Sequence, residues 1–165
     1  MNAIAIPVDT RLALLLPDAG FADAYRVSGV TPGLSARQAS QAIFDSPPPW
    51  INGLMALRNR IVSVFGLKAG VRPPSSTAQD SIGIFPVLAE SPEEMLMGLD
   101  DRHLDFRVAV SVQPAAAGAQ QITVTTVVHT HNRLGRIYLA VIMPFHRLIA
   151  RSMLNRAARS WRESA

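Results

Sequence analysis

Residues 104–112, LDFRVAVSV, alternate apolar side chains with polar or small ones at a period of two. That spacing is typical of a β-strand with one buried face, and here the face that carries Phe106 is expected to be the buried one. After a loop that contains Gly118, residues 122–131, ITVTTVVHTH, repeat the pattern; one face carries Ile122, Val124 and Val128, and the other carries Thr123, Thr125, Val127, His129 and His131. The two stretches predict an antiparallel pair of strands.

After this second strand the apolar spacing becomes helical. Apolar residues recur at every third or fourth position over residues 134–149, which predicts a long amphipathic C-terminal helix. Pro144 removes one backbone donor, so a kink or break is expected near Val141. Asn132 can cap the helix, and Gly135 can let the sheet and the helix approach closely. Because an antiparallel sheet has to bury its apolar face, this helix is its expected cover.

The N-terminal half predicts one further strand and two helices. Residues 23–30, DAYRVSGV, have the alternation of a short strand. Ser35 can cap a helix that runs to Ile43 and ends before the three prolines at 47–49. A second amphipathic helix is predicted from about Trp50 to Leu67, because its apolar residues share one stripe.

Two shorter strands complete the expected sheet. Residues 82–88 contain Pro86 and suit a single edge strand, and residues 95–99 predict another short strand. The order of strand, two helices, antiparallel strands and long C-terminal helix indicates an α+β fold in which the sheet wraps around that helix. We expect one domain over residues 1–165, with residues 1–20 as an N-terminal arm.

Composition excludes several classes of protein. The chain has 165 residues, 48% of them hydrophobic, and no cysteine, so a disordered chain, a disulfide framework and a thiolate site are all excluded. No continuous apolar run approaches the roughly 18 residues needed to cross a bilayer, so no transmembrane segment is expected and a soluble, cytoplasmic protein is predicted. The net charge is +6 from Arg133 onward and −2 before it. The positive charge is thus a property of the predicted C-terminal helix. A solvated helix face is the favoured interpretation, an anionic partner is the alternative, and no nucleic-acid partner is predicted.

Three stretches resemble an uncharacterised bacterial family known only as a domain of unknown function. They are PPPWINGLMALRNRIVSVFGLK (47–68), MGLDDRHLDFRVAV (97–110) and VVHTHNRLGRIYLAVIMPFHRLIARSML (127–154). Members of that family also resemble tail domains joined to NAD(P)-binding, short-chain-dehydrogenase-like proteins. The chain has no nucleotide-binding half, so no cofactor is expected. The element order is similar to the START-like helix-grip fold, which implies a cavity between the sheet and the long helix.

The histidines offer two kinds of chemistry. His103, His129 and His131 are expected on neighbouring strands and could form a metal site, although satisfied structural histidines are the favoured interpretation and no metal is predicted. His103 with Asp101 or Asp105 could instead carry acid–base catalysis. Because the Phe106 face is expected to be buried, these histidines should lie on the outer face or at a cavity mouth.

Aromatic and methionine side chains suggest a pocket. The first hypothesis is a domain that binds a small apolar or amphipathic molecule between the sheet and the C-terminal helix. Its predicted ligand-binding residues are Trp50, Met97, Phe106, Tyr138, Phe145, His129 and His131, with His103 and Arg107 as further candidates for its polar end. The second hypothesis is a cyclase, hydratase or isomerase that uses the His103 dyad; whether the protein is an enzyme stays open. The third is an interaction module whose arginine-rich C-terminal helix docks on a membrane or an acidic partner.

Overall fold

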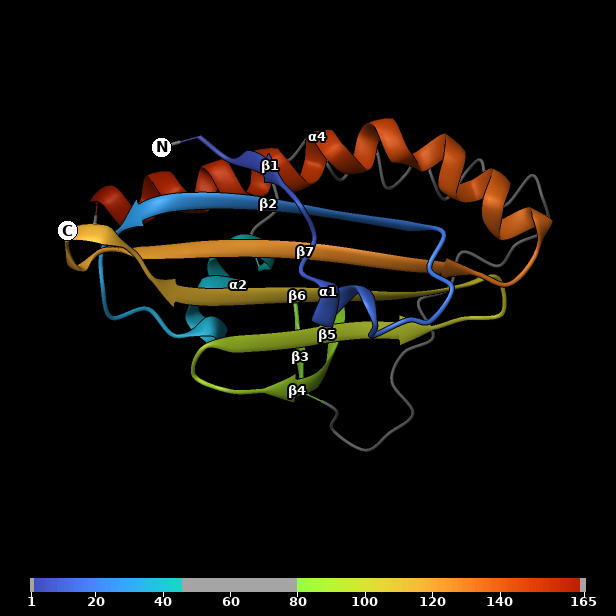
Figure 1. The fold of residues 1–165 in the computed structure, drawn as a ribbon, viewed down its shortest axis with the longest axis horizontal. Helices are drawn as coiled ribbons and strands as arrows, with labels where there is room; N and C mark the ends of the chain where they lie inside the picture. The colour runs from blue at the N-terminus through green and yellow to red at the C-terminus, as the bar shows by residue number, and fades with distance from the viewer. Residues whose placement is uncertain (1, 46–79, 164–165) are drawn as a thin grey trace.

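A computed structural model describes residues 2–45 and 80–163, and it has the expected α+β architecture (Figure 1). Within these residues the sheet is antiparallel and has seven strands in the order β1-β2-β7-β6-β5-β4-β3. The strands are β1 Ile4–Ile6, β2 Phe21–Val30, β3 Ser81–Ile82, β4 Phe85–Glu90, β5 Glu94–Asp100, β6 Leu104–Pro114 and β7 Gln120–Thr130. The helices are α1 Thr10–Ala13, α2 Ala36–Phe44 and α4 Arg133–Glu163, and the 3-10 turn Ala116–Gly118 joins β6 to β7.

The central pair of strands confirms the sequence prediction. Strands β6 and β7 pair antiparallel, with Phe106 opposite Val128 and Val110 opposite Val124. The Phe106 face packs into the hydrophobic core beneath α4 and α2, as the alternation predicts. The core lies between this face and the C-terminal part of α4; its helical members are Met153, Leu154, Ala157, Ala158 and Trp161.

Of the kink or break expected near Val141, the break is absent, because α4 is continuous through Pro144. Figure 1 shows that the helix bends along its length. Its corner with the sheet has the predicted structure. The Gly135 backbone N–H donates to Asn132 Oδ1 at 2.9 Å, and a Cβ built on Gly135 would lie 2.1 Å from the His103 carbonyl oxygen. Only glycine therefore allows the first turn of α4 to sit this close to the sheet.

Helix α2 begins where the sequence predicts. Ser35 accepts from the Gln38 backbone N–H, and the Gln38 side chain accepts from the Ser35 N–H, which completes a capping box. Ala36, Ala39 and Ile43 are buried against the same face of the sheet as α4. Arg37 of α2 pairs through its side chain with Asp80 and Glu90 and thereby ties the helix to β4.

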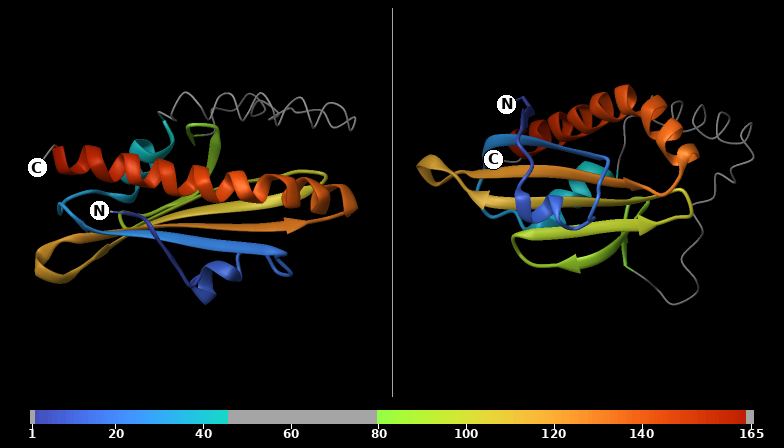
Figure 2. Two further views of the ribbon diagram at one scale, coloured as in Figure 1. Left: turned by 90° about the horizontal axis from the view of Figure 1, so that it is seen from above. Right: turned by 45° about the vertical axis from the view of Figure 1, so that its right-hand side comes forward.

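The other face of the sheet is covered in part by the N-terminal arm. Figure 2 shows α1 on the side of the sheet away from α4 and α2. Leu12 of α1 and Leu16 after it are buried, and Ala109 and Val127 are buried on the outer faces of β6 and β7. The sequence predicts an extended arm over residues 1–20. The structure instead has a strand and a short helix in this segment, and both pack on the domain.

The prediction of one edge strand over residues 82–88 is wrong. Strands β3 and β4 form a tight hairpin, with Ile82 paired to Phe85. Gly83 makes the turn with a positive φ of 58°, and its N–H donates to Asp45 Oδ1 at 2.8 Å. The helix predicted from Trp50 to Leu67, with the candidate ligand residue Trp50, lies outside the described residues.

Membrane-span potential also differs from the sequence expectation. Between Arg133 and Arg162, α4 is long and apolar enough to cross a membrane by length and composition alone, although a core helix can pass the same test. Arginines interrupt its apolar residues, so the sequence contains no continuous apolar run. Only 11% of its most apolar 18-residue window is buried, so much of this helix is uncovered.

Candidate functional site

The predicted histidine cluster forms on the outer face of the sheet. His131 Nε2 lies 2.9 Å from Asp105 Oδ1, and the His129 and His131 rings meet edge to face at 4.9 Å. His129 Nδ1 lies 3.0 Å from the backbone oxygen of Asp18, in the loop after α1. Because this cluster and α4 are on opposite faces, His129 and His131 cannot line a site between the sheet and α4.

His103 belongs to the strand-to-helix corner. Its Nδ1 accepts from the Asn132 side-chain amide at 3.1 Å, and its backbone oxygen accepts from the His131 N–H at 3.0 Å. Asp105, one of its two expected carboxylate partners, instead pairs with His131 and accepts from the Asp101 N–H at 3.1 Å. The geometry therefore assigns His103 a structural amide partner, and within residues 2–45 and 80–163 no three metal-ligating side chains come together.

The apolar candidates are divided between core and surface. Met97 is completely buried in the core. Phe106 is half-buried and stacks edge to face on Phe85, with ring centroids 5.6 Å apart. Tyr138 is half-buried on α4, whereas Phe145 is 40% exposed. These residues therefore range from fully buried to exposed. Arg107, on the outer face, pairs with Asp100 at 2.6 Å.

A second aspartate–histidine pair lies between the sheet and α4. Asp23 of β2 shares the core-facing side of its strand with Tyr25 and Val27, and His146 reaches it from α4. His146 Nε2 lies 3.2 Å from Asp23 Oδ1, and both side chains are largely buried, with 23% and 15% of their surfaces exposed. The Phe21 ring packs edge to face on the His146 ring at 5.8 Å.

The Asp23 carboxylate is incompletely satisfied. Its second oxygen, Oδ2, is buried and accepts no hydrogen bond in the described part of the chain. The pKa of the Tyr25 hydroxyl is raised first by burial, then by the neighbouring negative charge of Asp23 and by a side-chain hydrogen bond with that carboxylate, while the charges of Arg147 and Arg151 act in the opposite direction. An acidic, a phenolic and an imidazole group thus gather beneath α4.

The sequence pattern indicates one of the two residues of this pair, Asp23. Asp23 has the same strand parity as Tyr25 and Val27, so it is an acidic residue on a predicted apolar face. Nothing local indicates its partner, because His146 is 123 positions away.

The part of the chain that matches a known protein family includes both Asp23 and His146. A sequence model of the family described as "Protein of unknown function (DUF2867)" matches residues 15–153. The chain belongs to this family. No curated protein matches the chain.

Within the DUF2867 match, the Asp23–His146 pair can act in two ways. A carboxylate that accepts from one imidazole nitrogen fixes the ring orientation and leaves the other nitrogen to hold or accept a proton. A carboxylate with a vacant buried oxygen can also accept a hydrogen bond from a ligand. The buried Oδ2 of Asp23 without a partner meets the condition for the second of these roles.

Proposed function

We propose that this DUF2867 domain binds a small molecule with an apolar body and one hydrogen-bond donor, held between α4 and the sheet. The observation that carries the proposal is the buried, unpaired Oδ2 of Asp23. A buried polar atom without a partner costs about 1–3 kcal/mol, and more when the group is charged. A ligand hydroxyl or ammonium group at Oδ2 would remove that cost.

The surroundings of Asp23 suit the apolar body. On the α4 side of the sheet, Phe21 flanks Asp23 on β2, and Val128 and Thr126 are their partners on β7. Phe21 is only half-buried, whereas Val27 and Val30, farther along the same strand, have exposed fractions of 1% and 0%. Val128 and Thr126 are themselves buried, with exposed fractions of 6% and 7%, so of these neighbours only Phe21 offers partly exposed apolar surface to a ligand.

The overall architecture supports the same proposal. A long C-terminal helix on one face of an antiparallel sheet resembles the START-like helix-grip arrangement, in which a cavity lies between the two. The polar end of the ligand is assigned to Asp23 and His146 in place of His103, Arg107, His129 and His131, because those four belong to the outer face or its corner.

Matched small probes test the proposal by NMR. We would titrate ¹⁵N-labelled protein with cyclohexylmethylamine, cyclohexylmethanol and cyclohexanecarboxylate, which share one ring and differ in the polar group. The amine and the alcohol should shift the backbone amides around Asp23 and His146, and the carboxylate, which repels Asp23, should not. Asp23→Asn should weaken amine binding by about tenfold or more, the effect of one hydrogen bond to a charged group.

The outer face supplies the control. Asp105→Asn removes a carboxylate with the same type of histidine partner, His131 at 2.9 Å, and should leave probe binding unchanged. Amine binding as tight in Asp23→Asn as in the wild type, or amide shifts that map around Asp105, would refute the proposed site. So would the absence of any shift with the amine and the alcohol up to their solubility limits.

A further inference from the structure

Helix α4 has an exposed apolar stripe on its N-terminal half. Ile137, Val141, Phe145 and Leu148 have exposed fractions of 55%, 44%, 40% and 58%. Their spacing of four, four and three residues places them on one line along the helix. The helical period puts that line opposite the face that, farther along, buries Leu154, Ala157 and Trp161 in the core. The apolar pattern of α4 therefore covers the sheet with one face and leaves a second apolar face in solvent.

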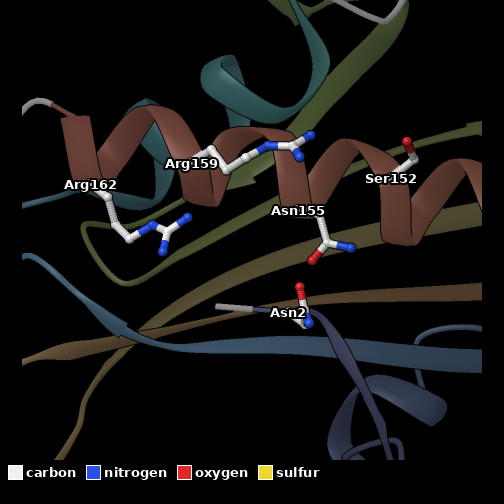
Figure 3. A pocket seen from close by; sticks show the side chains of 5 residues that line it. All are labelled: Asn2, Ser152, Asn155, Arg159 and Arg162. Atoms are coloured by element: carbon white, nitrogen blue, oxygen red, sulfur yellow. The ribbon is translucent and has the colours of Figure 1, made fainter.

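The same line becomes polar and cationic toward the C-terminal end. Ser152, Asn155, Arg159 and Arg162 follow the stripe and, with Asn2, line a surface pocket of about 280 Å³. Figure 3 shows Asn155 and Asn2 directed toward each other, with the two arginine side chains extending from the helix beside them. The side-chain oxygen Oδ1 of Asn155 already accepts a hydrogen bond from the Ala3 N–H. The charge in the pocket comes from the two arginines.

From its first residue to Arg162, helix α4 carries charged side chains of one sign only. Residues 133–162 contain seven arginines and no aspartate or glutamate. The ion pairs in the described part of the chain involve none of these seven. An exposed apolar stripe flanked and continued by unpaired cationic side chains is the pattern of a helix that lies in the interface of an anionic membrane.

We propose that the exposed face of α4 docks on an anionic phospholipid surface. The stripe from Ile137 to Leu148 enters the boundary between headgroups and acyl chains, and Arg159 and Arg162 contact lipid phosphates. Charge decides the occupant: a second copy would bring seven further arginines and no acidic partner from its own residues 133–162, whereas an anionic leaflet neutralises the arginines of α4. The helix lies on the membrane and does not span it, because its other face holds the sheet.

Vesicle flotation tests this docking. The probes are vesicles of phosphatidylcholine alone and of phosphatidylcholine with 30% phosphatidylglycerol. The wild-type chain should bind the anionic vesicles at least tenfold more tightly, with binding that weakens as salt rises. Arg159→Gln with Arg162→Gln should weaken binding by about 30-fold, since each basic residue near an anionic surface contributes roughly a fivefold gain. Ile137→Ser with Leu148→Ser should lower it by a similar factor.

Two control variants make the outcome specific. Leu88→Ser removes a side chain of similar exposure, 45%, from β4, and Arg102→Gln removes an exposed arginine that is not on α4; both should bind like the wild type. All substitutions are at exposed positions, and circular dichroism melts should confirm that each variant folds. The proposal is overturned if the wild type ignores anionic vesicles or if the stripe variant binds normally. It is also overturned if sedimentation shows a dimer that the stripe variant abolishes, which would identify a second copy as the occupant.

Discussion

Replacing Gly135 with alanine tests how closely α4 begins against the sheet. The new Cβ would lie 2.1 Å from the His103 carbonyl oxygen and 3.1 Å from its carbon. That oxygen accepts from the His131 N–H at 3.0 Å, so a retreat of about 1 Å to relieve the clash also strains this hydrogen bond. Overpacking of this kind costs about 3 kcal/mol at the upper end of its usual range, and alanine returns about 1 kcal/mol through helix propensity.

Gly135→Ala should therefore lower the free energy of unfolding by about 2 kcal/mol and the melting temperature by roughly 4–8 °C. Urea unfolding followed by far-UV circular dichroism, together with a thermal melt, measures both. Gly20→Ala is the matched control, because its nearest atom would be Thr130 Oγ1 at 3.9 Å; it should be neutral or slightly stabilising. If Gly135→Ala proves as stable as Gly20→Ala, the close helix–sheet contact is wrong, and with it the position of His146 above Asp23.

Three further outcomes follow from other contacts. Leu154→Ala should destabilise the domain by about 2–5 kcal/mol in urea, because Leu154 is fully buried in the core; a loss below 1 kcal/mol would contradict the packing of α4. Tyr138→Phe leaves Tyr25 as the one tyrosine of the chain. In this background, absorbance at 295 nm should show that the pKa of Tyr25 lies above its ordinary value of 10.0. Asp23→Asn should lower the pKa of Tyr25 only in part, since burial is the larger cause. An unchanged pKa would show that Asp23 does not act on the Tyr25 hydroxyl. Arg37 lowers the pKa of Asp80 and of Glu90 below their ordinary 3.8 and 4.5, so these pairs stabilise the fold above those values and lose their effect as pH falls through the lowered ones. Arg37→Met should thus be less stable than the wild type at pH 7 and equal to it in strong acid, and a pH-independent difference in urea midpoints would contradict this.

The fold was largely predictable because its elements have strong local patterns. The alternation around Phe106 determines which face of β6 is buried, and the side chain of Ser35 marks the start of α2. Asn132 and Gly135 likewise behave as the corner residues that their types suggest. The turn at Gly83 was missed because a glycine inside a short apolar run gives no sign of whether it bends the chain.

The candidate site and the exposed stripe required the tertiary structure. Asp23 and His146 meet only because β2 and α4 pack together, and no sequence period connects them. Apolar residues occur on opposite sides of the N-terminal half of α4, such as Val141 and Met143. The hydrophobic pattern alone therefore could not decide which side faces the sheet and which side faces solvent.

A high-resolution crystal structure of the chain grown with cyclohexylmethylamine tests the central claim most directly. We expect density for the ammonium group within about 3 Å of Asp23 Oδ2, the usual hydrogen-bond distance, with the ring packed toward Phe21. An Asp23 carboxylate whose two oxygens are both satisfied by the protein's own donors, for example the Tyr25 hydroxyl, with the amine absent, would contradict it.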